Sequence, residues 1–476
     1  MEQTDIVFIA PPAYSNAIEQ KPNKQSGHLP NLGICSLAAV VEREGYKVFI
    51  LDAVALQYSL LQVVDEVKTK NPKYVGLSAM THSISYAAMV AKFIKEKCPS
   101  VKIILGGVHI TSATEETLKK YPEYFDVAII GEGEVTLIEL MRTFENREVL
   151  SKVAGIAFLV NGEVVKTKPR ELVKNMDALP FPAWHLLPDL RTHYTPTLIS
   201  AGGISSNHLV TSRGCPGKCI FCDTSVTGHM VRGYSADYVL EMIDILHKKY
   251  KIDDIQFNDD TFVTLRKRLF DICEKLISKN YKLKWSCDAR ASDVTEEGLK
   301  LMKAAGCWQI AYGVETGSPR IMEFLKKRVT FDQIRNACKW AKKAGISTKG
   351  FFIIGHPTET RESIQETLDF MLSLDLDVIG VTFFTVYPGS PIYSSIHEYG
   401  TFNPDWNCVN TYEVGNFLPN GFTAEELAEF RKHILMRFYF RPRQILKYVA
   451  NVRSVYDLYR LVIGGSKVLK RNVLSF

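Results

Sequence analysis

Three cysteines stand within eight residues of the chain, at Cys215, Cys219 and Cys222. Thiolates are the ligands that zinc and iron–sulfur clusters prefer. A structural zinc site needs four protein ligands, typically from two Cys-x-x-Cys pairs, and this sequence has no second pair. The spacing Cys-x-x-x-Cys-x-x-Cys instead suits a four-iron cluster with one iron open to another ligand. A zinc knuckle and a chance grouping of buried cysteines are the alternatives.

The elements that must position these cysteines form a repeating pattern. From Leu209 to about Pro391, apolar strands alternate with helices about six times, which is typical of a parallel barrel. Polar or glycine-rich residues follow each expected strand, at the end where barrel enzymes place their active sites. Those that we select as candidates are Asp259, Asp260, Arg290, Glu315, Ser318, Gly355 and Tyr387.

A second alternating pattern precedes the cysteines. Residues 1–145 predict a five-stranded parallel sheet with crossover helices, whose ligand would bind beyond the carboxyl ends of the strands. Paired glycines there let a large flat ligand approach the backbone, and hydroxyls can hold its polar edge. A loop of about 18 residues after the first strand is a further candidate for ligand binding. The candidates at the strand ends are Ser78, Thr81, Gly106, Gly107, His109, Gly131 and Gly133.

The predicted fold is α/β throughout most of the chain. A doubly wound, Rossmann-like parallel-sheet domain (1–145) leads through a linker (146–195) to a partial (β/α)6 barrel (196–400). The linker contains a hairpin around Asn161-Gly162 and a proline-stiffened strap at 179–184. A lid and a helical, basic tail follow (401–476). The aromatic segment 406–422 is the expected lid, and Thr423 to Glu426 form a capping box that opens a helix to about Phe440.

Composition limits the class of protein. The chain is 46% hydrophobic and 23% charged, with no apolar run near the roughly 20 residues of a spanning helix. An acidic N-terminus without a signal peptide and seven scattered cysteines favour a reduced, cytoplasmic protein. From Arg431 onward eleven Lys and Arg face one acid, Asp457, so the tail carries +10 and the remainder −4. We therefore expect no nucleic-acid-binding face on the main body.

The cysteine spacing and the polar strand ends resemble the radical SAM superfamily. This resemblance implies a 4Fe–4S cluster on the three cysteines, S-adenosylmethionine (SAM) on the open iron, and an external electron donor of the flavodoxin or ferredoxin type. One electron then cleaves SAM to a 5′-deoxyadenosyl radical. By position, Asp259 and Asp260 would hold the SAM amino group and Arg290 its carboxylate. Glu315 and Ser318 would contact the ribose, while Gly355 and Tyr387 would flank the adenine.

The first 145 residues resemble the cobalamin-binding domain that precedes many radical SAM enzymes. The matching features are a proline-ended first strand, Gly106-Gly107-x-His109-x-Thr111 and the run from Gly131 to Glu134. The Asp-x-His-x-x-Gly motif that supplies a cobalt ligand elsewhere is absent, and Asp52 to Ala55 stand where it would begin. We therefore expect His109 beside the corrin edge rather than on cobalt. A flavodoxin-like domain that binds nothing is the alternative.

Together these features resemble cobalamin-dependent radical SAM enzymes. The implied reaction is C-methylation through methylcobalamin, with an oxidative cyclase or hydroxylase of the anaerobic magnesium-protoporphyrin ester cyclase type as the alternative. An iron–sulfur electron carrier without SAM chemistry is the hypothesis from another class. Methylthiolation is disfavoured, because no further N-terminal cluster site exists. The aromatic lid and basic tail favour a large apolar or lipid substrate. The tail itself predicts either a helical cap or a basic amphipathic surface for anionic membranes.

Overall fold

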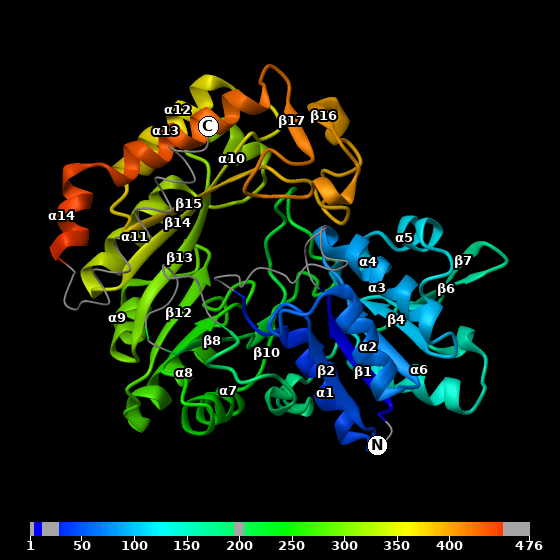
Figure 1. The fold of residues 1–476 in the computed structure, drawn as a ribbon. Helices are drawn as coiled ribbons and strands as arrows, with labels where there is room; N and C mark the ends of the chain where they lie inside the picture. The colour runs from blue at the N-terminus through cyan, green and yellow to red at the C-terminus, as the bar shows by residue number, and fades with distance from the viewer. Residues whose placement is uncertain (1–3, 12–27, 195–202, 204, 451–476) are drawn as a thin grey trace.

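The computed structural model describes residues 4–11, 28–194, 203 and 205–450. The predicted ligand-binding loop after Pro11 and the tail beyond residue 450 therefore fall outside the described residues. The described chain forms two α/β units that lie side by side (Figure 1). A C-terminal segment, drawn in orange, follows the second unit and brings a small hairpin near the first.

The front unit is a seven-stranded sheet with helices on both faces. Its five parallel strands follow the order β2-β1-β3-β4-β5, which confirms the predicted doubly wound sheet. Every residue of the interior strand β1 is buried, as expected when helices cover both faces. The strands are β1 (Ile6–Ala10), β2 (Val48–Asp52), β3 (Tyr74–Ser78), β4 (Lys102–Gly106) and β5 (Val127–Ile129). The helices are α1 (Leu32–Arg43), α2 (Leu60–Lys70), α3 (Ile84–Lys97), α4 (Val108–Ser112), α5 (Thr114–Lys120) and α6 (Glu134–Glu145).

The hairpin expected in the linker belongs to this sheet. Strands β6 (Ile156–Val160) and β7 (Glu163–Lys166) pair antiparallel to each other, and β6 pairs antiparallel to β5. Asn161 and Gly162 both have positive φ, at 51° and 82°, as a tight two-residue turn requires. The front sheet therefore continues to Lys166.

The strap after the hairpin fastens the two units together. The amide of Ala183 donates to the Cys35 carbonyl of α1 at 3.0 Å, and the Tyr238 hydroxyl donates to the Leu179 carbonyl at 2.7 Å. The Phe181 and Tyr238 rings lie 4.5 Å apart. One apolar cluster runs through the strap from the front unit into the second. The relative placement of the units thus has a packed core of its own.

The second unit confirms the predicted partial barrel. Six parallel strands follow the simple order β15-β14-β13-β12-β11-β8, each separated from the next by a helix on the outside. Its strands are β8 (Ser206–Leu209), β11 (Asp254–Phe257), β12 (Lys284–Ala289), β13 (Cys307–Glu315), β14 (Ser347–Ile354) and β15 (Val378–Phe383). The covering helices are α7 (Ala236–Asp244), α8 (Arg266–Lys279), α9 (Glu296–Ala304), α10 (Pro319–Phe324), α11 (Phe331–Ala344) and α12 (Arg361–Ser373).

The C-terminal segment joins the barrel back to the front unit. A short hairpin of β16 (Gly400–Phe402) and β17 (Phe417–Pro419) lies near α4 (Figure 1). The predicted capping box is present, and it opens α13 (Ala424–Tyr439), which leads to α14 (Pro442–Ala450). Within the described part of the chain, no helix combines the length and apolarity needed to cross a bilayer.

Candidate functional site

The three cysteines occupy a loop that leaves the barrel after its first strand. Strand β9 (Ser212–Arg213) pairs with β10 (Arg232–Gly233) and ends at Gly214. Gly214 has φ of +96°, and a Cβ there would collide with the Met230 carbonyl, so the turn into the loop requires glycine. The Ile220 amide donates to the Leu325 carbonyl at 3.1 Å. The loop is therefore anchored at both its entrance and its middle.

The donor set of this loop fits a four-iron cluster. Burial raises the pKa of Cys222 to about 12, with the neighbouring Cys219 and Cys215 as the next causes, so the three sulfurs lie close enough to repel one another as thiolates. Among the described residues no three His, Cys, Asp or Glu side chains converge on one metal ion. A cluster does not require such convergence, because each thiolate binds a different iron. Cys215, Cys219 and Cys222 would hold it.

The Arg290 side chain reaches this loop from the barrel. A Cβ on Gly217 would stand 2.5 Å from Nη1 of Arg290 and 3.3 Å from Sγ of Cys215, so the guanidinium lies against the loop. Arg290 also donates to the Lys327 carbonyl at 3.0 Å. Burial raises the pKa of Cys219, and the charges of Lys327 and Arg290 partly oppose that rise. Arg290 therefore lies against the loop that would hold the cluster, and its contact with the SAM carboxylate stays a prediction.

The neighbouring carboxylates Asp259 and Asp260 differ in burial and in their hydrogen-bond partners. Asp259 is buried and accepts from the Thr211 amide (2.6 Å), the Thr211 hydroxyl (2.7 Å) and the Ser212 hydroxyl (2.5 Å). These bonds tie β11 to the strand that carries the cysteine loop. Asp260 is exposed and accepts from the Gly214 amide at 2.9 Å. Only Asp260 lines the cavity described below, and the predicted SAM contact stays a prediction for both.

Four further candidates lie at the ends of β13 to β15. Glu315 is buried with φ of +67°, and Ser318 is buried at the N-cap of α10. Gly355 has φ of +77°, and its amide donates to Glu359 at 3.1 Å. Burial raises the pKa of Tyr387. The structure thus places all four at the carboxyl ends of barrel strands, and their adenine and ribose contacts remain predictions.

A cavity of about 370 Å³ lies between the two units. Glycines at the strand ends of the front sheet form one wall, and the start of the barrel forms the other, with Val226 and Thr227 as the contribution of the cysteine loop. Five of the seven predicted front-unit residues line it, namely Ser78, Gly106, Gly107, Gly131 and Gly133. From the second unit come Ser212, Arg213, Thr227, Asn258 and Asp260. The cavity fits part of a large flat ligand held between the glycine-rich edge and the cluster-bearing loop.

His109 and Thr81 do not line this cavity. His109 is fully buried, and its ring nitrogens lie 3.3 Å from the Thr81 hydroxyl and 3.0 Å from the Thr117 hydroxyl. Its ring meets that of Trp406 edge-on at 4.5 Å between centroids. Burial lowers the pKa of His109 to about 4, so the ring is neutral. Among the described residues His109 therefore anchors the C-terminal segment on the front unit.

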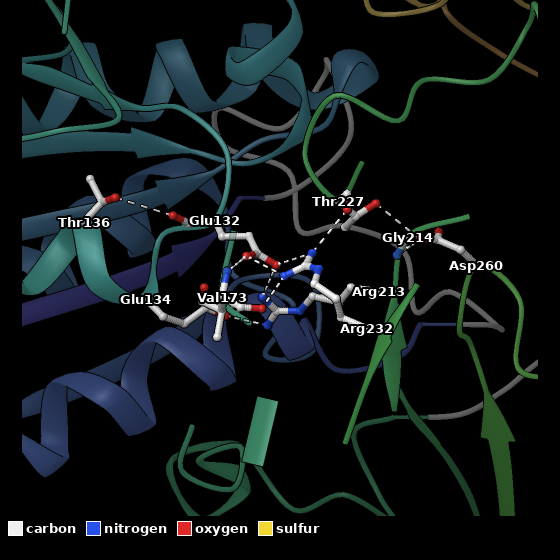
Figure 2. Close-up of polar contacts among 9 residues, drawn as sticks. All are labelled: Glu132, Glu134, Thr136, Val173, Arg213, Gly214, Thr227, Arg232 and Asp260. Atoms are coloured by element: carbon white, nitrogen blue, oxygen red, sulfur yellow. Dashed lines mark hydrogen bonds and ion pairs between the residues drawn. The ribbon is translucent and has the colours of Figure 1, made fainter. Parts of the chain in front are cut away.

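A buried charge network that the sequence patterns did not predict lies at the cavity wall, and Figure 2 shows it. Glu132 accepts from Arg213 at 2.9 Å and from two nitrogens of Arg232 at 2.9 and 3.0 Å, while Arg213 also pairs with Glu134 at 2.5 Å. Burial opposes ionisation of Glu132, yet bonds from Arg232 and Arg213 hold its pKa below the usual value. The run from Gly131 to Glu134 was a usable signal for the acids. Nothing in the sequence marks Arg232 as their partner.

Comparisons with known proteins agree with this geometry. The profile of the radical SAM superfamily matches residues 209–371, and that of the B12 binding domain matches residues 24–141. An uncharacterized methyltransferase of Pyrococcus horikoshii is 34% identical over 94% of this chain and 95% of its own. The anaerobic magnesium-protoporphyrin IX monomethyl ester cyclase of Cereibacter sphaeroides is 26% identical over 92% of this chain and 70% of its own.

A solved structure supports the same arrangement of domains. The cobalamin-dependent SAM radical enzyme OxsB, with aqua-cobalamin and SAM bound, superposes with a TM-score of 0.75 at 20% identity, covering 97% of this chain and 70% of that one. At this identity the likeness concerns the fold. Together with the relatives above, it places the chain in the radical SAM superfamily, in the branch that carries a B12-binding domain. Its cofactors are a 4Fe–4S cluster, SAM and cobalamin.

Proposed function

We propose that this protein methylates an unactivated carbon atom of a small-molecule substrate. The observation that carries the proposal is the shared cavity, whose two walls come from the B12-binding unit and from the start of the cluster-bearing barrel. Methyl transfer from a corrin to a substrate activated at the cluster needs both groups to face one space. The name of the full-length Pyrococcus relative favours methylation over the cyclase reaction.

The chain's own residues would bind and orient the reacting groups. When bound, the cluster and SAM supply hydrogen-atom abstraction, and cobalamin supplies methyl transfer. Cys215, Cys219 and Cys222 would hold the cluster, and Arg290 would pair with the carboxylate of SAM. The paired glycines admit the corrin to the strand ends of the front sheet. The buried Glu132 network holds the two walls of the cavity together.

Anaerobic reconstitution tests the proposal directly. The full chain, supplied with iron, sulfide, cobalamin and dithionite, is incubated with SAM that carries a deuterated methyl group and with an extract of a strain lacking the gene. We expect 5′-deoxyadenosine and a new extract metabolite that bears the deuterated methyl. A variant with all three loop cysteines changed to alanine is the matched control and yields neither.

The two alternatives give different results in the same experiment. A cyclase or hydroxylase would release 5′-deoxyadenosine and alter an extract metabolite without incorporating the deuterated methyl. An electron carrier would show the cluster by electron paramagnetic resonance but no 5′-deoxyadenosine at all. Each of these results would contradict methylation.

We further propose that the C-terminal helices contact anionic membranes and that the substrate is a large apolar molecule. Met436, Phe440, Ile445 and Leu446 are exposed beside arginines of α13 and α14. Such a surface is typical of interfacial helices. Leu446→Glu is expected to lower binding to vesicles containing phosphatidylserine, whereas Val149→Glu, at an exposed residue of the front unit, leaves it unchanged. Equal vesicle binding by wild type and both variants would refute the membrane contact.

A further inference from the structure

One lysine of the barrel lies inside the protein. Lys327 is only 6% exposed and is the one buried lysine among the described residues. Its Nζ lies 2.5 Å from Oε1 of Glu315, whose side chain is 10% exposed. Lysine is almost never buried without a partner, because its ammonium loses hydration. The neighbours Lys326 and Arg328 carry the same charge but are exposed, so their cations keep their hydration. A need for positive charge on the surface therefore does not explain why Lys327 is buried.

The backbone is shaped around this ion pair at several points. Glu315 adopts φ of +67°, a conformation that costs energy for any residue with a Cβ. The β13–β14 register shifts between Gly313 and Glu315, and such irregularities re-aim side chains at strand ends. A Cβ on Gly313 would stand 2.8 Å from Nζ of Lys327 and collide with Glu315. The ion pair thus occupies the space that a side chain at residue 313 would need.

The turn that contains Lys327 packs against the cysteine loop. In this turn the Leu325 carbonyl accepts a hydrogen bond from the Ile220 amide at 3.1 Å. The Lys327 carbonyl accepts a hydrogen bond from the Arg290 guanidinium at 3.0 Å. Arg290 in turn lies against Gly217 of the loop, so the turn of Lys327 contacts the loop both directly and through Arg290.

We propose that Lys327 is a positioning residue that sets the reduction potential of the four-iron cluster and holds Glu315 in the orientation that meets SAM. This inference rests on the proposed function, since it assumes a cluster on the loop. A fixed cation stabilises the cluster more after it has accepted an electron, because reduction adds negative charge. The bond to Oε1 also fixes the carboxylate. Oε2 makes no hydrogen bond to a described residue, which leaves it for a hydroxyl of the nucleoside.

Redox titration without SAM, followed by electron paramagnetic resonance, tests the charge effect on the reconstituted full chain. Lys327→Met keeps the length of the side chain and removes the cation, so we expect a more negative midpoint potential. Glu315→Gln removes the opposing charge, so the potential should become more positive. Lys326→Met changes the exposed neighbour and should leave the potential at the wild-type value. A purely structural role for the pair predicts no opposite shifts.

The dissociation constant of SAM provides a second readout. We expect it to rise at least tenfold in Lys327→Met, about twofold or less in Lys327→Arg, and not at all in Lys326→Met. If Lys327→Met fails to assemble a cluster, the double variant Glu315→Gln/Lys327→Met removes both buried charges, and its potential should fall between those of the single variants. Unchanged potentials in both single variants, or shifts of the same sign, would overturn the inference. A wild-type protein that forms no cluster would instead refute the proposed function.

Discussion

At the scale of single residues, buried charges set the architecture of this site. Glu132 and Arg232 are 4% and 5% exposed at their side chains and bond to each other through both oxygens and two nitrogens. Each would carry a heavy desolvation penalty without the other. Exposed pairs such as Glu171–Lys174 carry no such constraint. The interdomain joint therefore depends on a few buried ions rather than on the many exposed ones.

Glu132→Gln should destabilise the protein markedly. The substitution leaves Arg213 and Arg232 buried with their charges only partly compensated, and breaking a buried pair in this way costs about 3–5 kcal/mol. Thermal unfolding followed by circular dichroism measures the loss as a lower midpoint. Glu171→Gln, at the exposed pair, is the control and should unfold with the wild type. Equal midpoints for the two variants would show that the network contributes no stability.

Gly106→Val should remove cobalamin binding while leaving the fold intact. A Cβ at Gly106 would meet nothing closer than the Leu77 carbonyl oxygen at 4.0 Å, so the added side chain finds open space at the cavity. Gly107 differs, because its φ of +103° and the nearby Ala79 backbone exclude a side chain. Cobalamin retained after gel filtration should fall at least tenfold in Gly106→Val, with iron content and melting temperature at wild-type values. Full retention would place the corrin elsewhere.

At the scale of elements, the C-terminal segment fastens the front unit to the barrel. Trp406 is 6% exposed and packs in the core of the front sheet, although it follows the last barrel strand in the chain. The Lys120 ammonium lies 4.6 Å from the centre of its ring. The predicted lid thus begins at Trp406, which is packed in the front unit. Trp406 lies in the segment that connects β16 to β17, so it also holds this hairpin near the front unit.

His109 makes this anchor sensitive to acid. Burial and the charge of Lys120 lower the pKa of His109 to about 4, while the unfolded chain would protonate near 6.5. The stabilisation is therefore complete above pH 6.5 and is lost as pH falls toward 4. His109→Gln cannot take up the proton, so its melting temperature should decline less steeply over this range than that of the wild type. His208 and His356 also have pKa values lowered to about 4, and they contribute equally to both proteins. If the melting temperatures of the wild type and of His109→Gln declined in parallel as the pH fell, His109 would not be a source of the acid sensitivity.

Sequence patterns predicted the parts of this site that neighbouring residues determine. The spacing of the three cysteines, the turn at Asn161-Gly162 and the glycines of the front strands follow from local chemistry, and the structure places them as expected. Asp259 and Asp260 show the limit, because adjacent residues at a strand end point to opposite sides, and only one reaches the cavity. Glu132 and Arg232 lie 100 residues apart, so only the packing of two units reveals them as partners.

At the scale of the whole molecule, the two units also meet at the residue that follows the third cysteine. The Ser112 hydroxyl, at the end of α4, donates to Asp223 at 2.5 Å and lies 2.8 Å from the Ser225 hydroxyl. Asp223 directly follows the third cysteine. Pro182 of the strap and Glu132 of the network line the cavity, and the Ser112–Asp223 contact adds a further bond between the two units. The distance between corrin and cluster would thus be set by the assembled molecule, since no single element spans both walls.

Ser112→Ala should loosen both sides of this contact together. Removing the hydroxyl deletes a hydrogen bond to a charged group, worth about 1.5–3 kcal/mol. We expect hydrogen exchange in α4 and in residues 223–228 to quicken about tenfold or more in concert, because each 1.4 kcal/mol corresponds to a factor of about ten. Ser278→Ala in α8 removes a bond within its own helix and should change exchange only there. If α4 exchanged faster while residues 223–228 kept their wild-type rate, the contact would not couple the front unit to the cluster loop.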